Sequence, residues 1–353
     1  MRTPLPAPAS AGPVAGRGSW KRAALFLLGF AVLLALLGRA DPLTDVPVVG
    51  AKLAHFRRHV ARYDTLFLGS SLVHRQVSPA VYDAELAARG LPSSSFNFGI
   101  LGMVPPESYY LLERILDERP PNLRTVFLEL SSLQLRVKRE HTRRFDYWHS
   151  PRTTLDVVRG IRSAGWDRTV QAHQVRGHLE AALRKVFHCG QGPALLRTLF
   201  GPDDPAALGP DGDGWLSTED DTSNRIELRR ELGELEEEEL GVRLGALRAG
   251  GGAGAARREG EVGLELLARA IARVRAAGAT PILLVPPRHQ VKSSLAAHVR
   301  AHLDVEILEF DDPARYPELY APELRFDLNH LNRDGAALFS RLLAQRHAEM
   351  QGR

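Results

Sequence analysis

The chain has 353 residues, enough for one large domain or two smaller ones. Its composition, 44% hydrophobic and 25% charged, is ordinary for a globular protein. The formal net charge of +4 is small for this length and no basic stripe with interleaved aromatic residues is visible, so we expect no nucleic-acid partner. Cys189 is the only cysteine, which excludes an internal disulfide.

The N-terminal 40 residues have the pattern of a targeting or membrane-anchoring segment. Residues 1–19 are rich in Pro, Ala and Gly, and we interpret them as a disordered cytoplasmic N-terminus. An uncharged apolar run, Ala23 to Gly38, follows a basic flank, so residues 20–40 are predicted to be a membrane anchor or a signal segment. The basic flank predicts an inside N-terminus and an extracytoplasmic remainder. Cleavage near Ala40 would give a secreted form, and a buried helix of a soluble protein is the alternative.

Strand and helix patterns alternate from about residue 60. Short apolar runs predict strands at Thr65–Leu68, Ser95–Phe98 and Thr125–Leu130. Helices are predicted from Ser78 to about Gly90 and over Glu107–Asp117. Alternation of this kind is typical of a parallel sheet covered by helices.

The pattern stops and later returns. Residues 138–260 show no convincing strand, and we interpret them as a mainly helical insertion. Further on, helices and strands alternate again in this order: Leu264–Ala277, Pro281–Val285, Ser293–Leu303, Val305–Phe310 and Asn332–Arg346. The sequence therefore predicts a three-layer α/β domain made of residues 60–137 and 261–353.

Candidate site residues follow the predicted strands. In open α/β sheets ligands bind at the carboxyl ends of the strands. Polar or glycine-rich segments come directly after four strands, at Gly69–Ser71, Gly99–Gly102, Ser131-Ser132 and Pro286–His289. Asp327–His330 precedes the last helix and can reach the same edge, so we expect these segments to cluster.

The clustered residue types fit nucleophilic acyl chemistry. A serine hydroxyl becomes a good nucleophile only when a base takes its proton, and His330 is a suitable base. Asp327, three residues earlier, can accept from the other ring nitrogen and fix the tautomer. The backbone N–H groups of Ser71 and Gly102 are the expected oxyanion donors.

The order of these segments resembles the SGNH/GDSL hydrolase superfamily. Phe67-Leu68-Gly69-Ser70-Ser71 is similar to the first block of that family, with Ser71 at the nucleophile position and Ser70 in place of aspartate. Asn97 to Gly102 resembles the second block, which places Gly102 as an oxyanion donor. Asp327-Leu328-Asn329-His330 is similar to the last block, with Asp327 and His330 in their family roles.

The third block departs from the family pattern, because Ser131 stands where the oxyanion asparagine belongs. A Gly-Ser-Ser form and an N-terminal anchor resemble the membrane-anchored branch of cell-wall D-alanyl-transfer and alginate O-acetylation proteins. The resemblance implies a flavodoxin-like parallel sheet and an extracytoplasmic serine acyltransferase or esterase that acts on acyl groups of an envelope polymer or glycan. It implies no cofactor and no metal. Its expected partners are an acylated polysaccharide or acyl donor, the membrane, and an acyl-exporting membrane protein. The alternative is a catalytically inactive scaffold subunit.

Other polar residues have two interpretations each. His74 is either a rival base or substrate contact, or a polar residue near a helix, and Arg288 with His289 could contact an anionic group of the substrate. Glu129 lies within an apolar strand and needs a partner, for which an arginine is the favoured choice. The cluster Tyr147-Trp148-His149 is interpreted as insertion core rather than as a sugar site. The remaining histidines considered lack metal-ligand spacing and are interpreted as surface residues: His141, His173, His178 and His188.

Overall fold

The computed structural model describes residues 19–37, 46–133, 142–163, 166–189, 205–220, 259–288, 293–327 and 329–352. Its strands form one parallel sheet in the order β2-β1-β3-β4-β5. Their bounds are β1 Thr65–Gly69, β2 Ser95–Gly99, β3 Thr125–Glu129, β4 Thr280–Val285 and β5 Glu306–Glu309. The predicted α/β fold with a parallel sheet is confirmed. The strand order is that of a doubly wound sheet, in which successive strands are added on one side of β1 and then on the other, at β3.

Alternating side chains of each strand supply two separate cores, one on each face of the sheet. Leu66 and Leu68 of β1 join the first core, whereas Phe67 between them joins the second. The first core is covered by α2 (Pro47–Arg58), α5 (Glu107–Asp117), α11 (Glu259–Ala276) and α12 (Ser293–His302). The second is covered by α3 (Ser71–Gln76), α4 (Pro79–Ala88) and α13 (Arg333–Gln351). Strands buried on both faces explain the continuous apolar runs in the sequence.

Helix starts follow local capping chemistry. The Ser78 side chain caps α4 and Asn332 caps α13, each by accepting a backbone N–H three residues ahead. Two helices were not predicted. α2 carries buried Val49, Leu53 and Phe56 at helical spacing, and α3 has only six residues, too few for a periodic pattern.

Three further helices lie between β3 and β4: α6 (Arg143–Tyr147), α7 (Pro151–Ser163) and α8 (Arg168–Val186). Tyr147, Trp148 and His149 are buried there, so their interpretation as core residues is confirmed. The surface interpretation of His178 is wrong, because its Nδ1 lies 2.7 Å from His149 Nε2 and its side chain is buried. His141 and residues 190–204 and 221–258 lie outside the described residues.

Residues 205–220 return to the sheet and cover its β2 edge. They begin with the short 3-10 helix η2, Pro205–Leu208. The backbone N–H of Asn97 in β2 donates to the Asp213 carbonyl at 2.9 Å. Trp215 is buried, and its indole N–H donates to the Arg75 carbonyl at 2.9 Å. An open edge strand is thereby paired and shielded.

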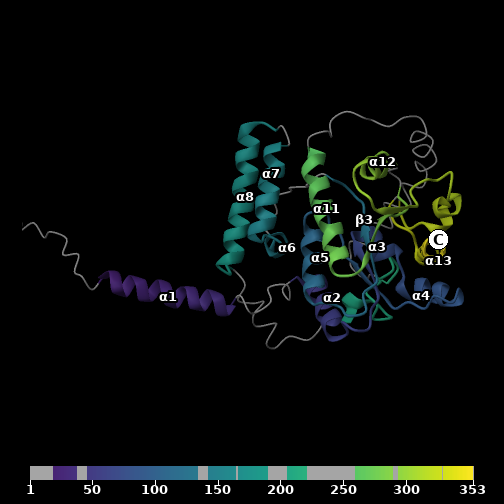
Figure 1. Cartoon of the computed structure of the whole chain (residues 1–353), viewed down its shortest axis with the longest axis horizontal. Helices are drawn as coiled ribbons and strands as arrows, with labels where there is room; N and C mark the ends of the chain where they lie inside the picture. Colours follow the sequence, from purple (N-terminus) through teal and green to yellow (C-terminus); the bar gives the residue numbers. More distant parts are fainter. Residues whose placement is uncertain are drawn as a thin grey trace, which may run out of the picture.

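The N-terminal helix α1 covers Ser19–Leu37 and includes most of the predicted apolar run. Its described side chains are largely exposed, and it extends away from the folded body (Figure 1), which it contacts where Phe30 stacks on Phe187. A search of the described residues for a helix with the length and hydropathy of a membrane span finds none. Residues 1–18 of the predicted disordered segment lie outside the described residues, and Ser19 is the first residue of α1.

Candidate functional site

The turn from β1 into α3 presents two serines with different tasks. The Ser70 hydroxyl caps α3 by accepting from the Leu72 backbone N–H at 3.2 Å. Ser71 is the first residue of α3 and is half-buried. Gly69 must be glycine here, because a Cβ would lie 2.4 Å from Val73 Cγ2 and 2.6 Å from Glu129 Oε2. The Gly-Ser-Ser sequence thus forms a sharp strand-to-helix turn with one hydroxyl left for another partner.

Ser71, His330 and Asp327 form a connected triad across 259 positions of sequence. Ser71 Oγ lies 2.9 Å from His330 Nε2, and His330 Nδ1 lies 2.8 Å from Asp327 Oδ2. An ionised carboxylate only accepts hydrogen bonds, so Nδ1 carries the proton and Nε2 of the neutral ring accepts from the serine hydroxyl. This is the direction in which a general base must face its nucleophile.

The Asp327–His330 turn is held by the aspartate itself. Asp327 Oδ1 accepts from the backbone N–H groups of Asn329 at 2.7 Å and His330 at 2.8 Å. Burial alone raises the pKa of the Asp327 carboxyl, but these bonds and the one from His330 outweigh burial and hold the pKa at about 2. The Asp327 carboxylate is therefore ionised in the folded protein at neutral pH.

Two buried amides fix α3 against its surroundings. Gln76 Nε2 donates to the Asn329 carbonyl at 2.9 Å, which ties α3 to the triad turn. Asn97 Nδ2 donates to the carbonyls of Val73 and Val77 at 2.8 and 2.7 Å, which satisfies the last turn of the helix. Neither role was predicted, although an asparagine in the apolar β2 strand was a signal for one.

The predicted oxyanion donors lie at the carboxyl ends of three neighbouring strands. Ser71 begins α3, so helix geometry leaves its N–H without an intrahelical acceptor. Gly102 follows β2 in an exposed turn with φ 66°, a backbone conformation that favours glycine. Ser131 is half-buried just beyond β3. All the strands are parallel, and the order in which the chain adds them to the sheet reverses between β1 and β3, which puts the site at the topological switch point.

Glu129 supports the turn between β1 and α3 from the neighbouring strand. Its Oε2 accepts from the Ser70 backbone N–H at 2.5 Å, and its Oε1 lies 3.4 Å from Arg288 Nη2. The side chains are 2% and 9% exposed, so this is a buried ion pair and the favoured arginine partner is confirmed. Arg288 Nε is buried without a partner. Arg288 thus lies next to this turn, while His289 lies outside the described residues.

A fully buried lysine lies behind α3, and nothing in the sequence marked it. Lys52 Nζ donates to the carbonyls of Asn97, Gly99 and Gly214 at 2.9, 2.8 and 2.6 Å, and it lies 3.0 Å from His74 Nδ1. Burial lowers the pKa of Lys52 well below its usual range and does the same for His74. His74 is therefore a neutral, buried contact of Lys52, and its ring faces this cluster through Nδ1.

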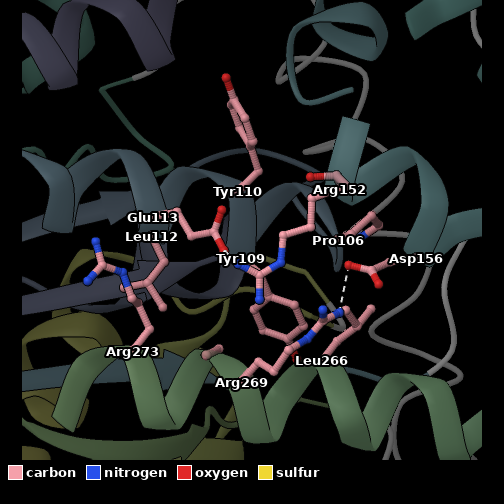
Figure 2. A pocket seen from close by; sticks show the side chains of 12 residues that line it. Pro106, Tyr109, Tyr110, Leu112, Glu113, Arg152, Asp156, Leu266, Arg269 and Arg273 are labelled. Atoms are coloured by element: carbon pink, nitrogen blue, oxygen red, sulfur yellow. Dashed lines mark ion pairs between the residues drawn. The ribbon is translucent and has the colours of Figure 1, made fainter. Parts of the chain in front are cut away.

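A separate hollow lies away from the triad, between α5, α7 and α11 (Figure 2). Its arginines are paired: Arg269 contacts Asp156 at 2.6 Å, and Arg152 approaches Glu113 at 3.7 Å. Burial raises the pKa of the Tyr109 phenol there. We interpret this hollow as part of the packing interface between the hairpin of α7 and α8 and the helices α5 and α11 that cover the sheet.

Comparison with models of known protein families finds no match for this chain, and a search of curated proteins finds no significant relative. Among the described residues no group of three or more His, Cys, Asp or Glu side chains is arranged to hold a metal ion. Functional inference therefore depends on the geometry of the triad and on the motif resemblance.

Proposed function

We propose that this protein is a serine acyl hydrolase or O-acyltransferase with an SGNH-type fold. The observation that carries the proposal is the continuous chain of contacts from Ser71 Oγ to His330 and from His330 to Asp327, at 2.9 and 2.8 Å. The sequence motifs independently predict the same three residues. Their position at the switch point of a doubly wound sheet supports the proposal.

In the proposed reaction Ser71 attacks the acyl carbonyl while His330 Nε2 takes the hydroxyl proton. Asp327 stabilises the imidazolium that forms. The N–H groups of Ser71 and Gly102 donate hydrogen bonds to the oxyanion, and a lost donor of this kind costs roughly 3 kcal/mol of transition-state stabilisation. His330 then gives its proton to the leaving alcohol. Water or an acceptor hydroxyl, activated by His330 in turn, takes the acyl group from Ser71 and regenerates the enzyme.

The substrate and location are proposed from the resemblance and from the N-terminal sequence. We assign the reaction to the extracytoplasmic side of a membrane, with acyl groups of an envelope polymer or glycan as substrate. An acyl donor delivered by a membrane protein fits the transferase form of the reaction. The paired carboxylate and imidazole need no metal or cofactor for acyl transfer.

Hydrolysis of p-nitrophenyl acetate by the full-length protein tests the proposal. Ser71→Ala should lower kcat/KM at least about 10³-fold, since it removes the nucleophile. Ser70→Ala is the matched control: it removes the neighbouring hydroxyl, whose contact is the helix cap, and should retain most of the activity. Equal activity of Ser71→Ala and wild type would overturn the proposal.

The scaffold alternative predicts a different result in cells. A strain lacking the protein should regain its wild-type envelope acylation from the wild-type gene but not from Ser71→Ala if the reaction is the function. Full restoration by Ser71→Ala would mean that the protein acts without a nucleophile.

A further inference from the structure

We propose that one face of α8 is a lipid-binding surface that holds the folded body against the membrane beside α1. The inference rests on the membrane location given under the proposed function, and it adds a second, peripheral contact to it. It does not depend on catalysis by Ser71.

The large hydrophobic side chains that are exposed among the described residues are confined to two places. Outside α1, every large hydrophobic residue that is exposed lies on the α7–α8 hairpin or immediately after it. These residues are Leu155, Val170, Leu179, Leu183, Val186 and Phe187, with exposures from 43% to 65%. Apolar side chains scattered singly need no explanation, whereas a concentration on one element marks an interaction surface.

Four of these residues form a stripe near the C-terminal end of α8. Leu179, Leu183, Val186 and Phe187 have the i, i+4, i+7, i+8 spacing of a single helix face. The buried residues of α8 are Gly177, His178 and Ala181, which lie on the opposite face by the same 3.6-residue period. The stripe is therefore turned away from α6 and α7, against which α8 packs.

A lipid surface fits the stripe because of its neighbour and its charge. The Phe187 ring is stacked with Phe30 of the apolar helix α1, at 6.2 Å between ring centroids. Figure 1 shows α8 as the outer helix of the body on the side where α1 lies. α8 carries four basic residues, Arg168, Arg176, Arg184 and Lys185, and one acid, Glu180. Arg176 pairs with Glu180 and Arg184 with Asp146 of α6, so the helix and its partner still keep a net positive charge. An apolar stripe on a basic helix is the composition of helices that lie on anionic membranes.

Cys189, the only cysteine, is exposed two residues after Phe187 and gives a native position for a probe. The full-length protein, labelled there with an environment-sensitive fluorophore, is reconstituted in vesicles of phosphatidylcholine and phosphatidylglycerol. We expect blue-shifted emission and quenching by spin-labelled lipids. The double variant Leu179→Asp, Leu183→Asp should lower this quenching roughly two-fold or more, because it puts charges on the stripe.

Val170→Asp is the matched control, since Val170 is exposed on the same helix but lies on the side opposite the stripe. It should leave quenching unchanged. Vesicle flotation of all three proteins reports α1, so loss of flotation would refute the membrane location rather than the role of α8. Wild-type protein that floats without lipid quenching, or whose Cys189 probe is shielded by a second copy as shown by cross-linking, would overturn the proposal.

Discussion

At the scale of single residues, the two adjacent serines have different hydrogen-bond partners, which is why Ser71 rather than Ser70 is the proposed nucleophile. Ser70 and Ser71 have the same hydroxyl, but Ser70 Oγ accepts from the Leu72 backbone N–H while Ser71 Oγ faces His330 Nε2. The backbone N–H of Ser70 is bound as well, by the buried Glu129 carboxylate. These contacts fix the turn between β1 and α3, so the Ser71 hydroxyl is held in its position facing His330.

The low pKa of Asp327 predicts that the free energy of unfolding decreases as the pH falls. Its folded pKa of about 2 lies below the ordinary 3.8, so its stabilising effect is complete above about pH 4 and is lost as the pH falls through 2. The difference corresponds to about 2 kcal/mol. Between pH 5 and pH 2 the free energy of unfolding of wild type should therefore fall by about that much more than that of Asp327→Asn. Urea titrations at each pH measure it, and parallel pH curves for the two proteins would contradict it.

Glu129 is predicted to be a positioning residue for the turn between β1 and α3. Glu129→Ala leaves the Ser70 N–H and the buried Arg288 without their acceptor, so unfolding should become easier by about 3–5 kcal/mol. Glu129→Gln should cost less, because an amide oxygen can still accept from Ser70. Urea denaturation midpoints measure both changes.

The control for Glu129 is Glu323→Gln, which changes an exposed carboxylate and should stay within about 0.5 kcal/mol of wild type. A Glu129→Ala protein as stable as this control would show that the ion pair does not hold the turn.

At the scale of elements, Lys52 joins four pieces of chain. It lies on α2, contacts the end of β2 and His74 of α3, and reaches Gly214 in the segment that covers the sheet edge. A lysine is rarely buried unless it is fully paired, and these contacts supply the pairing. The cluster packs α3 from behind while Gln76 holds it from the side of the triad turn.

Lys52→Met should lower the free energy of unfolding by about 3 kcal/mol or more, because buried carbonyls of Asn97, Gly99 and Gly214 lose their donor. Backbone amides of residues 212–216 should also exchange faster with deuterium. Arg346→Met, which removes only a surface pair with Glu349, is the control and should change little. Unchanged stability and unchanged exchange in Lys52→Met would contradict the linking role.

The sheet and its main helices could be predicted from sequence because each obeys a local rule. Glu107–Asp117 has the bounds expected from its apolar face, and β1 to β5 match the predicted runs within about two residues. α3 could not be predicted, because six residues carry no period. The burial of Lys52 and His178 could not be predicted either, since it depends on partners up to 162 residues distant.

In the candidate site, too, the residues in short motifs could be predicted, whereas those that depend on packing could not. Ser71, Asp327 and His330 could be selected because each sits in a short motif, and topology brings the ends of the strands together. The residues that hold them, Gln76 and Asn97, belong to no motif. Their roles arise from the packing of α3 on the sheet, which only the three-dimensional arrangement shows.

At the scale of the whole molecule, the triad joins the part of the sheet domain that precedes α6 to α8 with the part that follows them. The chain leaves the sheet after β3, builds α6 to α8, and returns through residues 205–220 to cover β2 before α11 resumes the α/β pattern. Ser71 comes before this excursion and His330 after it. The hydroxyl of Ser71 lies 2.9 Å from the imidazole of His330 because both parts of the chain are packed on the same sheet.

Labelling of the intact protein with a fluorophosphonate probe, followed by peptide mass spectrometry, tests directly whether His330 activates the Ser71 hydroxyl. We expect one adduct, on Ser71, that is absent in Ser71→Ala and strongly reduced in His330→Ala, because the probe reacts with a serine whose proton is removed by a base. A folded wild-type protein without an adduct, an adduct on Ser70, or equal labelling in the absence of His330 would contradict it.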